Sequence, residues 1–315
     1  MTCEDWLAFV RPWLSETLVS RQAYERLRGA ARQLPGEGLT ALEIRLAPLK
    51  EAEEEVDLSW KVPPAHRQIL RRWSAGDWPP VRSVWLEFDL ERSSEGLPDP
   101  ILCAEVEPGA DPLNVVDVLL PVMRGAPLEA AQRDRTLRCL AAIPPPARLF
   151  YVFDLSPRAH LPGAGPIRLE ILGLPPEEAP AFLAPFAPGL AAAVAAAAPL
   201  LAGTERPHLS FDIDSAGIAP RAGLEGSFVK WPHREPRWRE LFDRLVDRGL
   251  CDPAKREAVF AWPGQETFWA APGRWPAEAA GTRGVCVRAL SHVKVVARPG
   301  HAPEAKVYLL FGRFC

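Results

Sequence analysis

The sequence lacks the residue patterns that mark several common protein classes. It has three tyrosines and two methionines in 315 residues, and none of its six cysteines forms a CxxC pair. Its six histidines form neither an HxxxH nor an HExxH pattern. The spacing therefore predicts free thiols and no structural zinc site. There is also no Ser-His-Asp, P-loop or Rossmann signature that would identify a familiar enzyme class.

A strong charge imbalance is missing as well. The net charge is -3 at pH 7 and the isoelectric point is about 6.1, so no global basic field indicates nucleic-acid binding. The opening segment MTCEDWLAF has neither the basic stretch nor the small-residue cleavage site of a signal peptide. We therefore expect a cytoplasmic protein with no nucleic-acid partner.

One uncharged run, residues 179–203, is nominally long enough to cross a bilayer. It is interrupted by four prolines, and much of it is alanine, which is only weakly lipophilic. We expect broken, alanine-rich packing helices here rather than a membrane span.

Proline is abundant, with 35 residues, but the prolines fall between predicted elements rather than in one linker. No Gly/Ser tract or charge run divides the chain. The sequence therefore predicts a single domain over residues 1–315, in which residues 1–34 form N-terminal helices.

Period-2 alternation predicts strands in pairs, and each of the first four pairs is followed by sequence with helical character. The predicted strands are 42–46, 56–62, 84–90, 101–106, 150–155, 167–172, 208–214, 223–231, 286–296 and 305–311. The helix after the fourth pair is the clearest, with Pro236 suited to its first turn and Gly249 to its C-cap. Residues 42–311 thus form five repeats of hairpin plus helix.

Most of these strands have one apolar face and one ionisable face. An antiparallel sheet with helices on one side and water on the other would show the same alternation. A closed ten-stranded barrel with helices outside and a polar lumen also fits, and closure removes exposed edge strands. We favour the closed α+β barrel.

This order of five hairpin-plus-helix units resembles the ABBA-type prenyltransferases, whose antiparallel ten-stranded barrel (the PT barrel) holds the active site in its lumen. That family tends to place a glutamate on the first barrel strand, and ALEIRLA offers Glu43. It also uses Lys-x-Tyr pairs, in which lysine grips diphosphate and tyrosine shields a carbocation. AKVYL offers Lys306 and Tyr308. The segments LSHVKVV, EAKVYLLF, FDID and GLEGSF also resemble bacterial proteins associated with modified-peptide (RiPP) biosynthesis.

The resemblance implies transfer of a prenyl group from an allylic diphosphate to an aromatic or peptide acceptor. Such chemistry needs cations on the leaving group, aromatic faces around the carbocation and a base for the acceptor's proton. The basic candidates on polar strand faces are Arg45, Lys61, Arg168, Lys294 and Lys306, with Arg288 and Lys230 less well placed. The shielding candidates are Tyr151, Tyr308 and Trp85, and Glu43 is the base or anchor, with Glu87, Glu170 and Glu225 as competitors.

Asp212 and Asp214 share a predicted face and could hold Mg²⁺ against the diphosphate. No organic cofactor is implied. Two alternatives stay open. Opposite charges on one face, such as Glu43 with Arg45, suit an ion-pair network inside a non-catalytic binding protein, accessory to peptide natural-product biosynthesis. An unrelated α+β enzyme with an unrecognised site is the third hypothesis.

Overall fold

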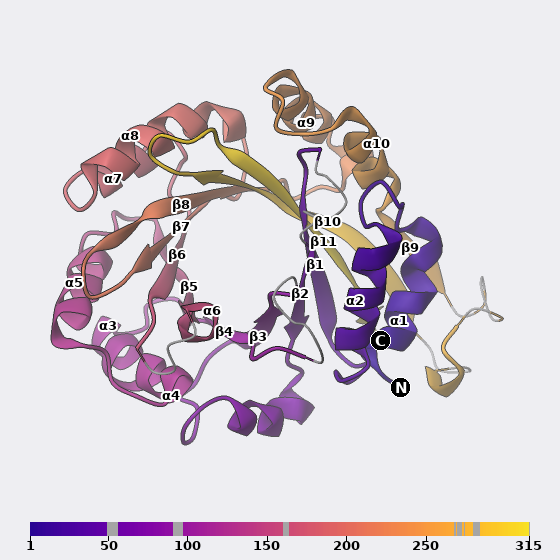
Figure 1. Cartoon of the computed structure of the whole chain (residues 1–315), viewed down its shortest axis with the longest axis horizontal. Helices are drawn as coiled ribbons and strands as arrows, with labels where there is room; N and C mark the ends of the chain where they lie inside the picture. The colour runs from indigo at the N-terminus through magenta and orange to yellow at the C-terminus, as the bar shows by residue number, and fades with distance from the viewer. Residues whose placement is uncertain are drawn as a thin grey trace.

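The fold is taken from a computed structural model, which describes residues 1–48, 56–90, 97–159, 164–267, 269, 273, 275–279 and 284–314. Ten strands close into an antiparallel barrel, because β10 and β11 pair with each other as well as with β8 and β1 (Figure 1). The barrel strands are β1 Leu39–Arg45, β2 Val56–Lys61, β3 Ser83–Phe88, β4 Ile101–Glu105, β5 Arg148–Asp154, β6 Ile167–Leu172, β7 His208–Ile213, β8 Ile218–Gly226, β10 Val285–Ala297 and β11 Glu304–Phe314.

Helices surround the ring of strands (Figure 1). They are α1 Cys3–Val10, α2 Arg21–Ala31, α3 Pro112–Asn114, α4 Leu120–Arg124, α5 Ala130–Ala141, α7 Ala179–Leu183, α8 Pro188–Ala197, α9 Arg237–Asp247 and α10 Pro253–Ala261. The short α6, Ser156–Ala159, lies instead in the β5–β6 connection. The expected closed barrel with outer helices is therefore confirmed.

The apolar strand faces pack outward against these helices. Val307, Leu309 and Phe311 alternate along β11 and are all buried in the main hydrophobic cluster, together with Leu241 and Phe242 of α9. Burying the full side chain of a Leu or Phe stabilises a fold by about 1.5–3 kcal/mol. The strand register is fixed by this burial, since a one-residue slip would turn the apolar set into the lumen.

Several local predictions agree with the structure. The alanine-rich run folds as α7, α8 and the 3₁₀ turn Ala198–Leu201, and among the described residues no helix is long and apolar enough to cross a membrane. Helix α9 ends before Gly249, whose φ of +69° is the left-handed conformation that glycine adopts most easily.

Two strand predictions were incomplete. Strand β8 covers Ile218–Gly226 rather than 223–231, because the chain leaves the barrel after Gly226 and residues 227–232 line a cavity instead. A short extra strand, β9 Gly264–Thr267, pairs with the first part of β10. Its sequence, GQET, has no apolar alternation, so periodicity could not reveal it.

Candidate active site

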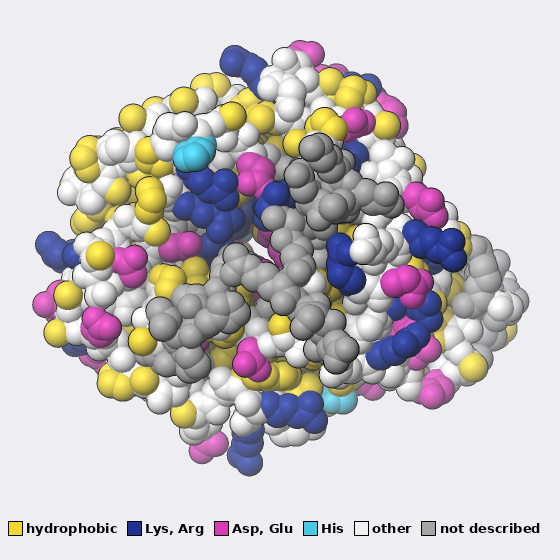
Figure 2. Space-filling model, viewed as in Figure 1, with side chains coloured by type: hydrophobic (Ala, Val, Ile, Leu, Met, Phe, Trp, Pro, Cys, Tyr) yellow, Lys and Arg dark blue, Asp and Glu magenta, His cyan; other side chains and the backbone are white. Residues whose placement is uncertain are grey.

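The lumen contains a cavity of about 850 Å³. Its outer lining comes from the strand ends that lead to the connecting helices and from the segment after β8, and includes Arg82, Arg148, Arg206 and Lys230. All ten barrel strands contribute to the lining, which mixes acidic, basic and aromatic groups. A cavity of this size is within the usual range for binding a small organic ligand. Figure 2, viewed along the barrel onto one of its faces, shows acidic and basic side chains bordering a central hollow.

The Lys-x-Tyr pair of β11 meets the glutamate of β1 behind this cavity. Glu43 is the direct register partner of Tyr308, and its carboxylate accepts hydrogen bonds from both Lys306 Nζ and the Tyr308 hydroxyl. Tyr308 lines the cavity, and its ring stacks on His292 with ring centres 4.0 Å apart. Glu43 and Lys306 do not line the cavity, so they can affect a bound molecule only through the Tyr308 side chain that Glu43 holds in place.

The charges of this cluster are mutually dependent. Burial alone would raise the pKa of Glu43, but the positive charges of Lys306 and Lys294 hold that pKa far below its usual range. Burial and the nearby Glu43 charge raise the pKa of Tyr308 instead. Glu43 is therefore an ionised anchor for two donors and a weak proton acceptor.

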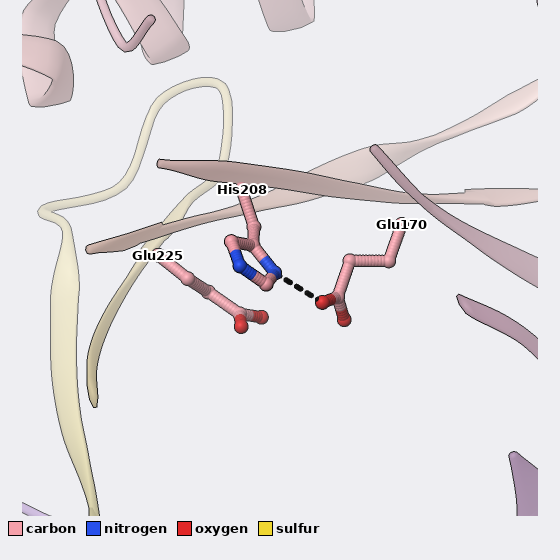
Figure 3. Close-up of side chains that lie close together, drawn as sticks. All are labelled: Glu170, His208 and Glu225. Carbon is pink, nitrogen blue, oxygen red and sulfur yellow. Dashed lines mark hydrogen bonds and ion pairs between the residues drawn. The ribbon is translucent and has the colours of Figure 1, made fainter. Parts of the chain in front are cut away.

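A second cluster lies on the neighbouring strands β6, β7, β8 and β10, next to the first, and Figure 3 shows three of its side chains. His208 Nδ1 donates to Glu170 at 2.5 Å, and Glu225 lies on the other side of the imidazole. The Lys294 ammonium is 2.7 Å from Glu225. Burial raises the pKa of the Glu225 carboxyl, but the positive charge of Lys294 outweighs this effect and lowers the pKa to about 2. Burial and the charge of Glu225 raise the pKa of Glu170. All four side chains line the cavity, so they can reach a bound molecule.

Two other predicted basic residues are held in ion pairs away from the cavity lining. Arg168 donates from Nε and Nη2 to the two Asp212 oxygens at 2.6 and 3.1 Å, and both residues are buried. Arg45 Nε lies 2.8 Å from Glu304. Such pairing offsets the charge of each cation and reduces its attraction for an added diphosphate.

Lys61 and Arg288 have different surroundings. The Lys61 ammonium lies 5.7 Å from the centre of the Trp85 ring, a cation–π contact. The Arg288 guanidinium lies 3.8 Å from the centre of the Trp13 ring, outside the lumen. A β-bulge between Leu290 and His292 puts the side chains before it on the opposite face of β10 from the one that alternation predicts. Simple alternation along β10 therefore misplaced Arg288.

The two aspartates proposed for Mg²⁺ have separate roles. Asp212 binds Arg168, while Asp214 Oδ1 accepts from the backbone N–H groups of Ala216 and Gly217 in the β7–β8 turn. This donor set does not fit a shared Mg²⁺ site, because one carboxylate has an arginine and the other shapes a turn.

All three predicted shielding residues, Tyr151, Tyr308 and Trp85, line the cavity. Tyr151 and Trp85 also pack against a small apolar cluster on the lumen side, formed by Ile101, Cys103, Phe153 and Leu155. Aromatic and apolar side chains therefore make up part of the cavity wall between β3 and β5, beside the carboxylates of Glu87 and Glu105.

Sequence reasoning missed Arg82, Arg148 and Arg206 in the lining. Arg148 is the first residue of β5. Because a β-bulge lies between Leu149 and Tyr151, the Arg148 side chain is on the lumen face, where simple alternation from Tyr151 would not place it. Arg206 lies just outside β7, where alternation carries no information. Arg206 and Lys230 have no carboxylate within 4.0 Å among the residues that the structure describes, and the same holds for Arg148.

No protein-family model matches the sequence, and no curated protein matches it. Among solved structures, 5-dimethylallyltryptophan synthase from Streptomyces coelicolor aligns with a TM-score of 0.51 and 11% identity, over 97% of this chain and 95% of that one. The apo form of the prenyltransferase PriB aligns with a TM-score of 0.49 and 13% identity, over 97% and 94% of the two chains. The chain therefore has the closed ten-stranded fold of the ABBA prenyltransferases.

Proposed function

We propose that the protein transfers a prenyl group from an allylic diphosphate to an aromatic acceptor, free or within a peptide, bound in the lumen. The observation that carries this proposal is the make-up of the cavity. It combines three cations that have no carboxylate within 4.0 Å among the described residues, Arg148, Arg206 and Lys230, with the aromatic rings of Trp85, Tyr151 and Tyr308. The similarity in fold to a protein named as a 5-dimethylallyltryptophan synthase supports the same reaction class.

In this proposal the diphosphate lies against Arg148, Arg206 and Lys230. The bond between the allylic carbon and the diphosphate oxygen breaks, and the cations stabilise the departing negative charge. The allylic carbocation faces Tyr151 and Trp85, whose ring faces attract positive charge. A new bond to the acceptor then forms, and the displaced proton passes to a lumen carboxylate or to water.

Glu43 has an indirect part in this reaction. Its ionised carboxylate fixes the Tyr308 hydroxyl and the Lys306 ammonium, so the Tyr308 ring stays packed on His292 at the cavity wall. The carboxylates that line the cavity are Glu87, Glu105, Glu170 and Glu225, and a proton leaving the acceptor reaches these first. Glu43 is thus a positioning residue in our proposal.

The reaction is tested by incubating the protein with tryptophan, or a tryptophan-containing peptide, and with dimethylallyl or geranyl diphosphate. We expect pyrophosphate release coupled to a prenylated product, detected by mass spectrometry. An Arg148→Gln/Arg206→Gln variant should lose at least tenfold in kcat/KM, since each charge-assisted hydrogen bond contributes about 1.5–3 kcal/mol. Arg248→Gln, an exposed change at the end of α9, is the matched control.

The second candidate is a binding protein of the same shape, accessory to peptide modification. The pairing of Arg168 with Asp212 and of Lys294 with Glu225 favours it, because these cations are already neutralised. A binder would show neither pyrophosphate release nor stabilisation by either diphosphate in thermal unfolding, whereas an enzyme lacking only its acceptor would still be stabilised.

A further inference from the structure

Three side chains with metal-ligating atoms converge on one wall of the cavity. The ligand atoms offered by Glu170, His208 and Glu225 all lie within 4.8 Å of one another. Both glutamates are buried, with 5% and 4% of their surface exposed. Figure 3 shows the imidazole between the two carboxylates.

These side chains are carried by adjacent strands rather than by loops. Glu170 lies on β6, His208 opens β7 and Glu225 lies on β8, and His208 is the direct register partner of Glu225. Strand backbones hold their side chains more rigidly than loops do, so the three ligand atoms are fixed near one another before any ion arrives.

A second imidazole lies beside one of these ligands, Glu225. His292 on β10 has an Nε2 atom that is shielded from solvent and makes no hydrogen bond within the described structure. That atom lies 3.3 Å from Glu225 Oε2, and the ring is held by stacking on Tyr308. A buried imidazole nitrogen without a hydrogen bond is unfavourable, and coordination to a metal ion would satisfy it.

The remaining neighbour of the cluster is compatible with an ion. Lys294 Nζ binds Glu225 Oε1 at 2.7 Å, which leaves Oε2 on the side of His292. Carboxylates that ligate metals are commonly held by such an outer hydrogen bond. The positive charge of Lys294 also weakens the attraction for any cation, so a strong imidazole ligand is required.

We propose that Glu170, His208 and Glu225, with His292 within reach, bind a first-row divalent metal ion, for which Zn²⁺ is the best match. Zn²⁺ accepts mixed carboxylate and imidazole ligands, whereas Mg²⁺ and Ca²⁺ prefer all-oxygen sites. The ligands line the cavity, so the open coordination position faces a bound molecule, as in catalytic zinc sites. The metal-site proposal rests on this ligand geometry and not on prenyl transfer, although Glu170 and Glu225 line the same cavity.

The full chain is stripped with a chelator, dialysed against Zn²⁺, and measured for metal content by mass spectrometry and for affinity by calorimetry. We expect one tightly bound ion per chain and at least tenfold weaker binding of Mg²⁺ and Ca²⁺. His208→Ala and Glu225→Gln should each weaken the Zn²⁺ affinity by at least tenfold. His301→Ala, an exposed histidine in the β10–β11 turn, should leave it unchanged.

A measurement on the unaltered protein guards against variants that fail to fold. Zn²⁺ should protect His208 from modification by diethyl pyrocarbonate, read by peptide mass spectrometry. Binding without this protection, equal uptake by His208→Ala, or no uptake at all overturns the proposal. Because neither prenyl donor nor acceptor is present, these outcomes leave the prenyl-transfer proposal untouched.

Discussion

The two ends of the lumen carry the same kinds of side chains but use them differently. At the paired end, next to the hairpin turns, Arg168 binds Asp212 at 2.6 Å and Arg45 binds Glu304 at 2.8 Å. At the cavity end, next to the helical connections, Arg206 and Lys230 have no carboxylate within 4.0 Å among the described residues. Among the described residues, Arg45 and Arg168 at the first end are paired with carboxylates, whereas Arg206 and Lys230 at the second end line a cavity of about 850 Å³ without such a partner.

This difference shows what a polar lumen does and does not imply. Alternation of ionisable and apolar residues places charges inside a barrel, but it does not distinguish structural ion pairs from a binding site. Buried pairs are retained in proteins without any ligand, since each partner offsets the desolvation of the other. Only the cations left without a carboxylate remain able to bind an added anion.

The largest expected effect comes from breaking the paired end. Arg168→Met should lower the free energy of unfolding by about 3–5 kcal/mol, because it removes the two charge-assisted hydrogen bonds that the buried Asp212 carboxylate accepts from Arg168. The double variant Arg168→Met/Asp212→Leu should recover most of this loss. Arg206→Met at the cavity end should change stability by less than about 0.5 kcal/mol. Urea unfolding measures all three, and equal losses at the two ends would contradict the comparison.

The second prediction concerns which end binds a diphosphate. Arg206→Gln/Lys230→Gln should raise the Kd for dimethylallyl diphosphate at least tenfold, which corresponds to about 1.4 kcal/mol. Arg45→Gln at the paired end should change this Kd less than twofold, because its guanidinium already binds Glu304. Calorimetric titration distinguishes the two. If the Arg45 variant lost affinity instead, the sequence prediction would hold and the cavity-end assignment would be wrong.

The strand pairs, the barrel and the outer helices could be predicted because alternation and helical periodicity are local properties of the sequence. The three shielding residues, Tyr151, Tyr308 and Trp85, were placed on the lumen side for the same reason. Their exact partners could not be predicted, since these depend on register between strands far apart in the chain. The contact of Glu43 with Tyr308, separated by 265 residues, is set by the closure of β1 onto β11.

The errors came from features that interrupt alternation. A β-bulge in β5 places the Arg148 side chain in the lumen, and another in β10 places the Arg288 side chain outside it. Neither bulge contains a glycine or proline that would mark it in the sequence. The Glu170–His208–Glu225 cluster was missed because its members lie on three strands with no fixed spacing between them. Glu170 and Glu225 were predicted only as candidate bases, and nothing local in the sequence linked either of them to His208.

The smallest expected effect lies at the boundary between the two ends, where Glu43 and Asp57 are direct register partners on β1 and β2. Burial and the negative charges of Glu43 and Asp89 raise the pKa of Asp57 well above its usual value. The pKa of Glu43 is lowered, because Lys306 and Lys294 outweigh the effect of its burial. Neighbouring carboxylates therefore act on stability in opposite directions.

Asp57→Asn should stabilise the protein at pH 8 by an amount on the order of 1 kcal/mol, since each pH unit between the folded and unfolded pKa values is equivalent to about 1.4 kcal/mol. The ionised Asp57 side chain destabilises the fold above its raised pKa, so this gain should shrink as the pH falls toward the unfolded value near 4. Glu43→Gln should instead destabilise the fold at neutral pH, and this difference should begin to shrink only below the unfolded pKa of about 4.3, because the folded carboxylate stays ionised well below that pH. Urea midpoints between about pH 3 and pH 8 measure both trends, with Asp77→Asn, an exposed change, as the control. Parallel pH dependences for the two variants would mean that Glu43 and Asp57 share one environment, and that no boundary divides the lumen there.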